Sequence, residues 1–138
     1  MSKTLTGGCL CGAVRYTITA EPFMQAVCHC KNCQRQAGSG WSMILGLPES
    51  GVESTGTVQT YVDHGTSGGE VHRQFCPTCG TGLFYTNAEM LPGIIDIQSA
   101  TLDTAADEVP GAQIQCAERL AWIDDLAALH RFERYPGQ

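Results

Sequence analysis

The sequence predicts a mainly all-β fold in a single domain, and three observations lead to this class. The chain has 138 residues, a length that suits one domain with a modest buried core. Its 16 glycines point to many turns, and few stretches favour helix. Several short segments alternate in polarity or are rich in β-branched residues, as half-buried strands are.

Short strands are expected along most of the chain. They are residues 13–19, 24–28, 41–47, 52–54, 58–62, 71–75, 82–86, 94–97 and 114–116. Two pairs of neighbours are expected to form hairpins, because only a short turn separates their members. Residues 52–54 would pair with 58–62 around Thr55-Gly56, and residues 71–75 would pair with 82–86.

Helical structure is expected at only two places. Residues 31–37 predict a turn or short helix that ends at Gly38, a common residue after a helix. Residues 124–129 predict a short C-terminal helical turn, with acidic residues suitably at its N-terminal end. Residues 63–69 form a polar, glycine-rich stretch that predicts a mobile loop, and residues 101–111 predict a second loop.

Composition and charge exclude several partners. The formal net charge is −6, whereas nucleic acid is bound mainly through Lys and Arg, so no nucleic acid is expected. No stretch approaches the roughly 18 consecutive apolar residues of a membrane span, so no membrane partner is expected either. The first residues lack the apolar run of a signal peptide. A cytoplasmic location, where thiols stay reduced, is therefore expected.

Seven of the eight cysteines fall into three clusters, and only Cys116 stands alone. In a reducing compartment, clustered cysteines bind metal more often than they form disulfides. A disulfide framework is the alternative, but partners one residue apart, such as Cys9 with Cys11 or Cys28 with Cys30, would close a strained ring. The clusters are Cys9-Leu10-Cys11, Cys28-His29-Cys30-Lys31-Asn32-Cys33 and Cys76-Pro77-Thr78-Cys79.

The outer two clusters predict one closed zinc site. Cys76 and Cys79 have the CxxC spacing that places two thiolates on one turn. A structural zinc needs four protein ligands, and Cys9 with Cys11 is the only compact pair left to complete it. A zinc saturated in this way leaves no position for a substrate, so its role is structural. Two unrelated thiol pairs are the alternative.

The central cluster predicts a second metal site with only three thiols, Cys28, Cys30 and Cys33. A catalytic zinc keeps one coordination position open, whereas a structural zinc does not. His29 lies between two of these ligands, but extended backbone would turn its side chain away from them. A closed site completed from a distance is one alternative, and the candidates are His64, His72, His130 and Cys116. A metal-free cysteine nucleophile activated by His29 is another.

The three motifs together resemble the glutathione-dependent formaldehyde-activating enzyme family, which includes centromere protein V. The resemblance covers roughly residues 5–130 and rests on Gly8-Cys9-Leu10-Cys11-Gly12, on the stretch from Cys28 to Gly38, and on Phe75-Cys76-Pro77-Thr78-Cys79-Gly80. It implies a tent-like fold of short mixed β-sheets around a structural zinc. It also implies two zinc ions per chain: a structural zinc on Cys9, Cys11, Cys76 and Cys79, and a catalytic zinc on Cys28, Cys30 and Cys33.

The resemblance further implies an activity. The family condenses glutathione with formaldehyde to S-(hydroxymethyl)glutathione, which is a carbon–sulfur lyase reaction in reverse. A small-molecule thiol and an aldehyde are therefore the expected partners, with glutathione as co-substrate. This chain departs from the family at Gln113, where a histidine is usual.

Several side chains near the central cluster could take part in such chemistry. Glutathione is anionic, so Lys31, Arg35 and Arg73 are the candidate contacts, although each could be an ordinary surface charge. His29 could shuttle a proton or hydrogen-bond a metal ligand. Cys116 is expected to be a small buried hydrophobe. The aromatic residues expected to pack the C-terminal tail are Trp122, Phe132 and Tyr135.

Two functions remain open at this point. The first is a zinc enzyme that makes or breaks a carbon–sulfur bond on a thiol such as glutathione. Three thiolates leave a zinc with a net charge of −1, which favours capture of a thiol over strong activation of a carbonyl. The second is a non-catalytic zinc module with two closed sites that works through protein contacts.

Overall fold

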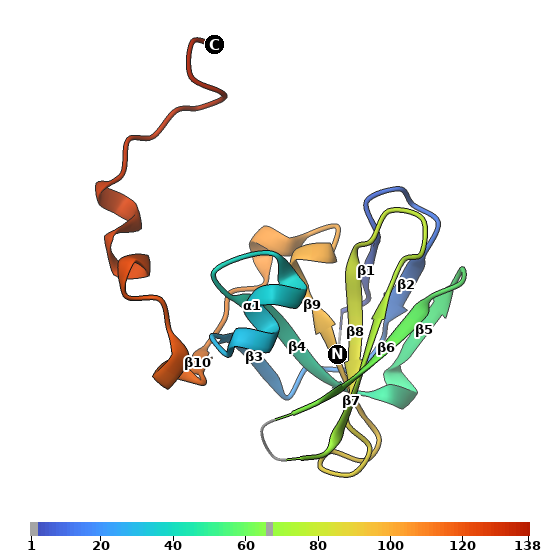
Figure 1. The fold of residues 1–138 in the computed structure, drawn as a ribbon. Helices are drawn as coiled ribbons and strands as arrows, with labels where there is room; N and C mark the ends of the chain where they lie inside the picture. Colours follow the sequence, from blue (N-terminus) through green and yellow to red (C-terminus); the bar gives the residue numbers. More distant parts are fainter. Residues whose placement is uncertain (1–2, 66–67) are drawn as a thin grey trace.

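The computed structural model describes residues 3–65 and 68–138, and it confirms a mainly β fold built from two sheets. The small sheet has the antiparallel order β1-β2-β5, and the large sheet has the order β10-β3-β4-β9-β8-β7-β6 (Figure 1). In the large sheet, β10 runs parallel to β3 and the other pairs are antiparallel.

The small sheet consists of β1 (Leu5–Gly8), β2 (Arg15–Ile18) and β5 (Val52–Thr55). The large sheet consists of β3 (Met24–Cys28), β4 (Ser42–Pro48), β6 (Gln59–His64), β7 (Glu70–Phe75), β8 (Gly82–Thr86), β9 (Ile94–Gln98) and β10 (Ala112–Ile114).

The main core joins the small sheet to one face of the large sheet. Ile18 of β2, Leu45 and Leu47 of β4 and Ile97 of β9 are fully buried in a single apolar cluster. Tyr16 of the small sheet meets Phe84 of the large sheet edge to face, with ring centroids 5.5 Å apart, a favoured aromatic geometry. The opposite face of the large sheet carries a smaller cluster of Ala26, Ile44 and Tyr85.

The helical segments are short. The helix α1 (Lys31–Ala37) follows β3 and ends at Gly38, whose φ of 64° lies in the left-handed region, as the sequence predicts. The other segments are 3-10 turns at Glu49–Gly51, Ser99–Thr101, Ala105–Asp107, Cys116–Glu118 and Ala121–Ala128. The longest of these turns has 8 residues. Among residues 3–65 and 68–138, no helix has the length and apolar character needed to cross a bilayer.

The expected hairpin between residues 52–54 and 58–62 is wrong. β5 pairs with β2 in the small sheet, whereas β6 pairs with β7 in the large sheet. Between them the chain passes close to Ala13 at Gly56, where a side chain would clash with the Ala13 carbonyl oxygen and where φ is 90°. Val52 packs against the main core from β5. These two neighbouring strands therefore belong to different sheets.

Several smaller expectations differ from the structure. β1 was not expected as a strand, and β10 ends at Ile114, because the backbone turns at Gln115 with a φ of 56°. Cys116 begins an exposed turn after this edge strand and is not buried. The expected mobile loop at 63–69 starts later, since β6 extends through His64, and residues 66–67 lie outside the described part of the chain.

The C-terminal segment passes close to Gly40 at Leu120, Trp122 and Ile123, and beyond these residues it extends away from both sheets (Figure 1). Its helical turn begins at Ala121, three residues before the expected start, and is a 3-10 turn. Trp122, Phe132 and Tyr135 are 52%, 56% and 77% exposed, so the expectation that they pack the tail is wrong. The cause is geometric, because the chain leaves the edge of the large sheet and residues 124–138 are all exposed.

Candidate metal centres and the adjoining cavity

The first candidate metal centre brings two distant cysteine pairs together. The four Sγ atoms of Cys9, Cys11, Cys76 and Cys79 all lie within 4.8 Å of one another. Cys9 and Cys11 follow β1 of the small sheet, and the other pair lies between β7 and β8 of the large sheet. The predicted grouping of these four residues is therefore present in the structure.

The spacing of these thiols suits a tetrahedral zinc. Zinc–sulfur bonds of about 2.3 Å place the sulfurs of a regular tetrahedron about 3.8 Å apart. The Cys9 and Cys11 sulfurs are 3.6 Å apart, and those of Cys11 and Cys76 are 3.8 Å apart. A closed site of four thiolates fits this cluster without further ligands.

Two similar backbone turns hold the pairs. Gly12 and Gly80 follow the second cysteine of each pair with φ values of 81° and 79°, a conformation that glycine adopts at little cost. Nothing lies within 4 Å of the position that a Cβ would take at either residue, so backbone conformation and not crowding requires glycine there. Cys9 N donates to Val14 O at 3.0 Å, and Cys76 N donates to Thr81 O at 3.0 Å.

A hydroxyl group and a backbone N–H donate hydrogen bonds to two sulfurs of this cluster, those of Cys79 and Cys9. The Thr81 hydroxyl donates to Cys79 Sγ at 3.2 Å and accepts the Leu10 N–H at 3.1 Å, so it links the two turns. Hydrogen bonds from the Thr81 side chain and backbone lower the pKa of Cys79 to about 5. The Val14 N–H donates to Cys9 Sγ at 3.2 Å. Sequence reasoning missed Thr81, although a hydroxyl two residues after a CxxC pair is a usable signal.

The second candidate centre comes from one short stretch of chain. Cys28 ends β3, Cys30 caps the start of α1, and Cys33 lies in the first turn of α1. Their Sγ atoms lie within 4.8 Å of one another. Within residues 3–65 and 68–138, no fourth His, Cys, Asp or Glu joins this group. The residues considered as possible distant ligands, His64, His72, His130 and Cys116, lie outside it.

Charge within the three-cysteine centre is concentrated on Cys33. A hydrogen bond from the Cys28 thiol lowers the pKa of Cys33 to about 5, and the same bond raises the pKa of Cys28. The neighbouring Cys30 thiol and the nearby charge of Arg73 lower the Cys33 pKa further. The Cys33 N–H also donates to Cys30 Sγ at 3.2 Å. Among the three thiols, the surroundings favour the ionised form of Cys33 alone, because burial raises the pKa of Cys30 as well.

His29 turns toward β10 and not toward the thiols. Its ring is 1% exposed, and Nε2 donates to Oε1 of Gln113 at 2.8 Å. The Nδ1 atom is buried without a hydrogen-bond partner among the described residues. Gln113, the residue that replaces the usual histidine of the family, therefore anchors His29 between β3 and β10. His29 does not line the cavity beside the thiols.

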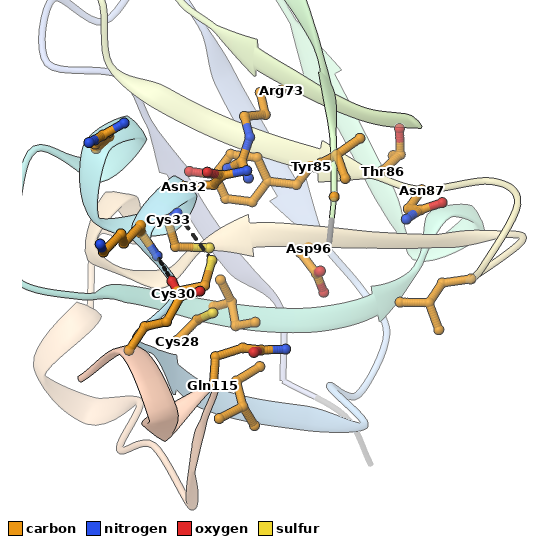
Figure 2. Close-up of a pocket in the computed structure, with 18 of the residues that line it drawn as sticks. Cys28, Cys30, Asn32, Cys33, Arg73, Tyr85, Thr86, Asn87, Asp96 and Gln115 are labelled. Carbon is orange, nitrogen blue, oxygen red and sulfur yellow. Dashed lines mark hydrogen bonds between the residues drawn. The ribbon is translucent and has the colours of Figure 1, made fainter. Parts of the chain in front are cut away.

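A cavity of about 450 Å³ opens beside the three-cysteine centre, which is within the usual range for small-molecule sites. Figure 2 shows the three thiols at one end, Thr86 and Asn87 at the other, and Tyr85 and Asp96 between them. The three expected cationic residues, Lys31, Arg35 and Arg73, all line this cavity. The four-cysteine centre lines none of it.

The three cationic residues differ in their exposure to solvent and in their contacts with other side chains. Lys31 and Arg35 are exposed and lie one turn apart on α1. Arg73 is only 7% exposed, its Nε donates to Asp63 Oδ2 at 3.0 Å, and its guanidinium lies 5.2 Å from the Tyr85 ring centroid. Arg73 therefore belongs to the cavity wall, whereas Lys31 and Arg35 lie at its rim.

Sequence reasoning also missed Asp96, which lines the cavity from β9. Burial, and then the negative charge of Cys33, raise the pKa of Asp96 to about 6. The signal was present in the sequence, because Asp96 interrupts the apolar strand Ile94-Ile95-Asp96-Ile97. An acidic residue in a central strand must face a partner, solvent or a ligand.

Two thiol clusters on a two-sheet β scaffold, one closed and one beside a cavity, define a cysteine-rich, candidate two-metal protein. The sequence profile of a known family, described as "Glutathione-dependent formaldehyde-activating enzyme", matches residues 4–118. The chain belongs to this family, as the resemblance of its motifs predicts.

Two individual proteins are also similar to the chain. One is a protein of Halomonas elongata with the name "Putative glutathione-dependent formaldehyde-activating enzyme", 36% identical over 87 residues. The match covers 58% of this chain and 54% of that protein, so the chain spans about half the length of this relative. The other is a crystal structure of a Rhodobacter sphaeroides protein, with a TM-score of 0.61 and 20% identity. It covers 78% of this chain and 98% of that chain, and it shows a shared fold.

Proposed function

We propose that the protein is a zinc-dependent enzyme that joins the sulfur of glutathione, or of a related small thiol, to the carbon of formaldehyde or another small aldehyde. The product with glutathione and formaldehyde is S-(hydroxymethyl)glutathione, and the reverse reaction is that of a carbon–sulfur lyase. The observation that carries the proposal is the contrast between a closed four-thiol centre and a three-thiol centre that borders a 450 Å³ cavity.

Each cluster has its own part in this proposal. Cys9, Cys11, Cys76 and Cys79 hold a structural zinc, and Cys28, Cys30 and Cys33 hold a catalytic one. Zinc at the second site supplies an open coordination position and Lewis acidity, which lower the pKa of a thiol that enters the cavity. Thiols must be reduced to bind zinc, so a reducing compartment such as the cytoplasm is part of the proposal.

Residues of the chain bind and orient the thiol. Lys31 and Arg35 are exposed on the rim of the cavity and suit the carboxylates of glutathione. Arg73 is tied to Asp63 and acts on the cluster, because its charge stabilises the Cys33 thiolate. His29 lies between Cys28 and Cys30 and hydrogen-bonds to Gln113, so it holds this part of the backbone in place. It takes no proton from the substrate.

The addition balances without an oxidant or reductant. The thiol gives up its proton, its sulfur forms a bond to the carbonyl carbon, and the carbon–oxygen π pair moves to oxygen. The oxygen then takes one proton, so the product contains all the atoms of the thiol and the aldehyde and nothing leaves. Positioning the two reactants in one cavity contributes to the rate because it removes the entropy of their encounter.

A second function is favoured by one observation. The C-terminal segment exposes several large apolar side chains, which suit contact with another protein and would serve a non-catalytic zinc module. They are Trp122, Leu126, Leu129, Phe132 and Tyr135.

A thiol-dependent aldehyde assay separates the two functions. Zinc-loaded protein is expected to consume formaldehyde, or another member of a small aldehyde panel, only when a thiol such as glutathione is present. Protein stripped of zinc, and the Cys30→Ser variant, are expected to be inactive. X-ray absorption at the central zinc should report a water or a substrate sulfur as fourth ligand. A fourth ligand from the protein would contradict the proposal.

A further inference from the structure

The cavity contains a carboxyl group that the proposed chemistry does not use. The side chain of Asp96 projects from β9 into the cavity (Figure 2). Strand register places Asp96 in a row with Tyr85 and Arg73 on one side and Gly46 on the other. These residues share the face of the large sheet that forms the cavity floor, because directly paired residues point to the same face.

The protein supplies no partner to one oxygen of this group. Oδ1 of Asp96 is buried and has no hydrogen-bond partner among the described residues. Tyr85, its neighbour on β8, donates its hydroxyl to Gln36 and accepts from Gln98. Gly46, its neighbour on β4, has no side chain to offer. A buried carboxyl left in this way is costly to the fold.

Two charged groups of the cavity, Arg73 and Glu118, are engaged by other residues, whereas Lys31 and Arg35 lie exposed at its rim. Arg73 is bound to Asp63, and Glu118 accepts the Lys31 N–H at 2.5 Å. No ion pair involving Asp96 is found in residues 3–65 and 68–138. Burial and the charge of Cys33 hold the Asp96 pKa at about 6, so the group is mostly ionised at neutral pH. A negative charge in the cavity floor without a protein cation suits a cation that arrives with the ligand.

We propose that Asp96 binds the ammonium group of the thiol substrate, so that the cavity selects thiols that carry an amino group. This inference rests on the proposed function and names the substrate class of the same cavity. Glutathione fits, because its γ-glutamyl end carries an ammonium group as well as a carboxylate. The cationic rim of Lys31 and Arg35 would receive the carboxylates, and Asp96 would receive the ammonium group.

A matched pair of thiols tests the proposal. Glutaryl-cysteinylglycine differs from glutathione only in lacking the amino group. The binding of both to zinc-loaded protein would be measured by calorimetry, without aldehyde, for wild type and Asp96→Asn. Wild type is expected to bind glutathione about tenfold or more tightly than the analogue, as a charge-assisted hydrogen bond would provide. Asp96→Asn is expected to lose this preference while binding the analogue as wild type does.

A second variant controls for charge. Asp125→Asn removes one exposed carboxylate from the C-terminal segment, outside the cavity, and is expected to keep the preference of wild type. Circular dichroism and zinc content would show that both variants are folded and loaded. Equal binding of the two thiols by wild type, or an equal loss for both in Asp96→Asn, would overturn the inference. So would unchanged binding of both thiols with a slower reaction, which would assign Asp96 to proton transfer.

The two proposals can fail separately. If wild type prefers glutathione to its analogue but consumes no aldehyde, the proposed reaction is wrong and the ammonium site stands. If wild type consumes aldehyde equally well with either thiol, and Asp96→Asn binds both like wild type, the reaction stands and the ammonium site is wrong.

Discussion

The two cysteine clusters use the same ligand atoms but differ in how the chain reaches them. The four-cysteine centre joins pairs that are 65 residues apart, measured from Cys11 to Cys76, and these pairs come from different sheets. The three-cysteine centre comes from a single stretch between Cys28 and Cys33. Two distant turns can surround an ion from opposite sides, whereas one short stretch approaches it from one side. The second arrangement leaves a direction free, and the cavity lies there.

Their surroundings differ in the same sense. Around the four-cysteine centre, the Thr81 hydroxyl and the Val14 N–H donate hydrogen bonds that hold the sulfurs of Cys79 and Cys9 in place. Around the three-cysteine centre, the cavity is lined by Asp96, which has one buried oxygen without a hydrogen-bond partner among the described residues, and by the exposed cations Lys31 and Arg35. These surroundings agree with the proposed division of roles, in which the first region serves stability and the second serves binding.

The largest effect is expected from breaking the closed centre. Cys79→Ser should unfold or aggregate the protein, because the proposed zinc would no longer tie the two sheets and a structural zinc supplies much of the folding free energy of small domains. Circular dichroism and size-exclusion chromatography would measure this loss. Cys116→Ser is the matched control, since Cys116 is exposed and outside both clusters, and it should fold like wild type.

The next effect is expected at the open centre. Cys30→Ser should abolish thiol-dependent aldehyde consumption and reduce the zinc content from two ions to one, while most of the fold stability remains. The reason is that this centre lies beside α1 and does not join the sheets. Metal analysis together with thermal melting would test it. If Cys30→Ser and Cys79→Ser lose their folding equally, the division of roles between the clusters is wrong.

A smaller effect is expected from the hydroxyl that links the two turns. Thr81→Val removes the donor to Cys79 Sγ and the acceptor of the Leu10 N–H. Such supporting contacts typically change metal affinity by about 10- to 100-fold. Chelator competition should therefore show faster and deeper loss of the structural zinc in Thr81→Val. Thr81→Ser retains the hydroxyl and should behave like wild type, and equal loss in both variants would count against this role.

The smallest effect is expected from Asp96→Asn, and this substitution should raise the stability of the fold instead of lowering it. The pKa of Asp96 rises from 3.8 in the unfolded chain to about 6 in the fold, chiefly through burial. The unfolded state therefore loses this proton first, and wild type loses stability as the pH rises from about 4 to about 6. Asp96→Asn should be more stable than wild type at pH 7 by about 1–2 kcal/mol, allowing for solvent in the cavity.

Urea denaturation at two pH values measures this difference. At about pH 3 or below, Asp96 is mostly protonated in both the folded and the unfolded state of wild type, so the gain of Asp96→Asn should largely vanish there. A gain that persists at about pH 3 would mean that the variant improves packing and that ionisation of Asp96 is not its cause.

The membership of both clusters could be predicted because each pair or triple is local in sequence. Cys76 and Cys79 share one turn, and Cys28, Cys30 and Cys33 share the junction of β3 and α1. The end of α1 at Gly38 was equally local, since a left-handed residue closes the helix. Joining the two cysteine pairs, which are 65 residues apart measured from Cys11 to Cys76, needed a further argument, namely that a structural zinc requires four ligands.

What could not be predicted depends on contacts between distant residues. Residues 52–55 and 59–64 look like a hairpin, but pairing with β2 and β7 separates them. The exposure of Cys116 follows from the course of the chain beyond β10, which no local pattern encodes. Asp96 was visible in the sequence, but its position in the cavity required the register of β8, β9 and β4.

The 65-residue separation between Cys11 and Cys76 also sets an order of assembly. The three central thiols lie inside this loop and are complete once Cys33 has been synthesised, so the nascent chain can load them early. The first pair has to wait for Cys76 and Cys79, and closing a loop of this length costs about 4 kcal/mol of chain entropy. The walls of the cavity on β8 and β9 are made later still. Zinc supply during synthesis would therefore decide whether an ion proposed for the three-cysteine centre binds to a finished cavity or to an unfolded chain.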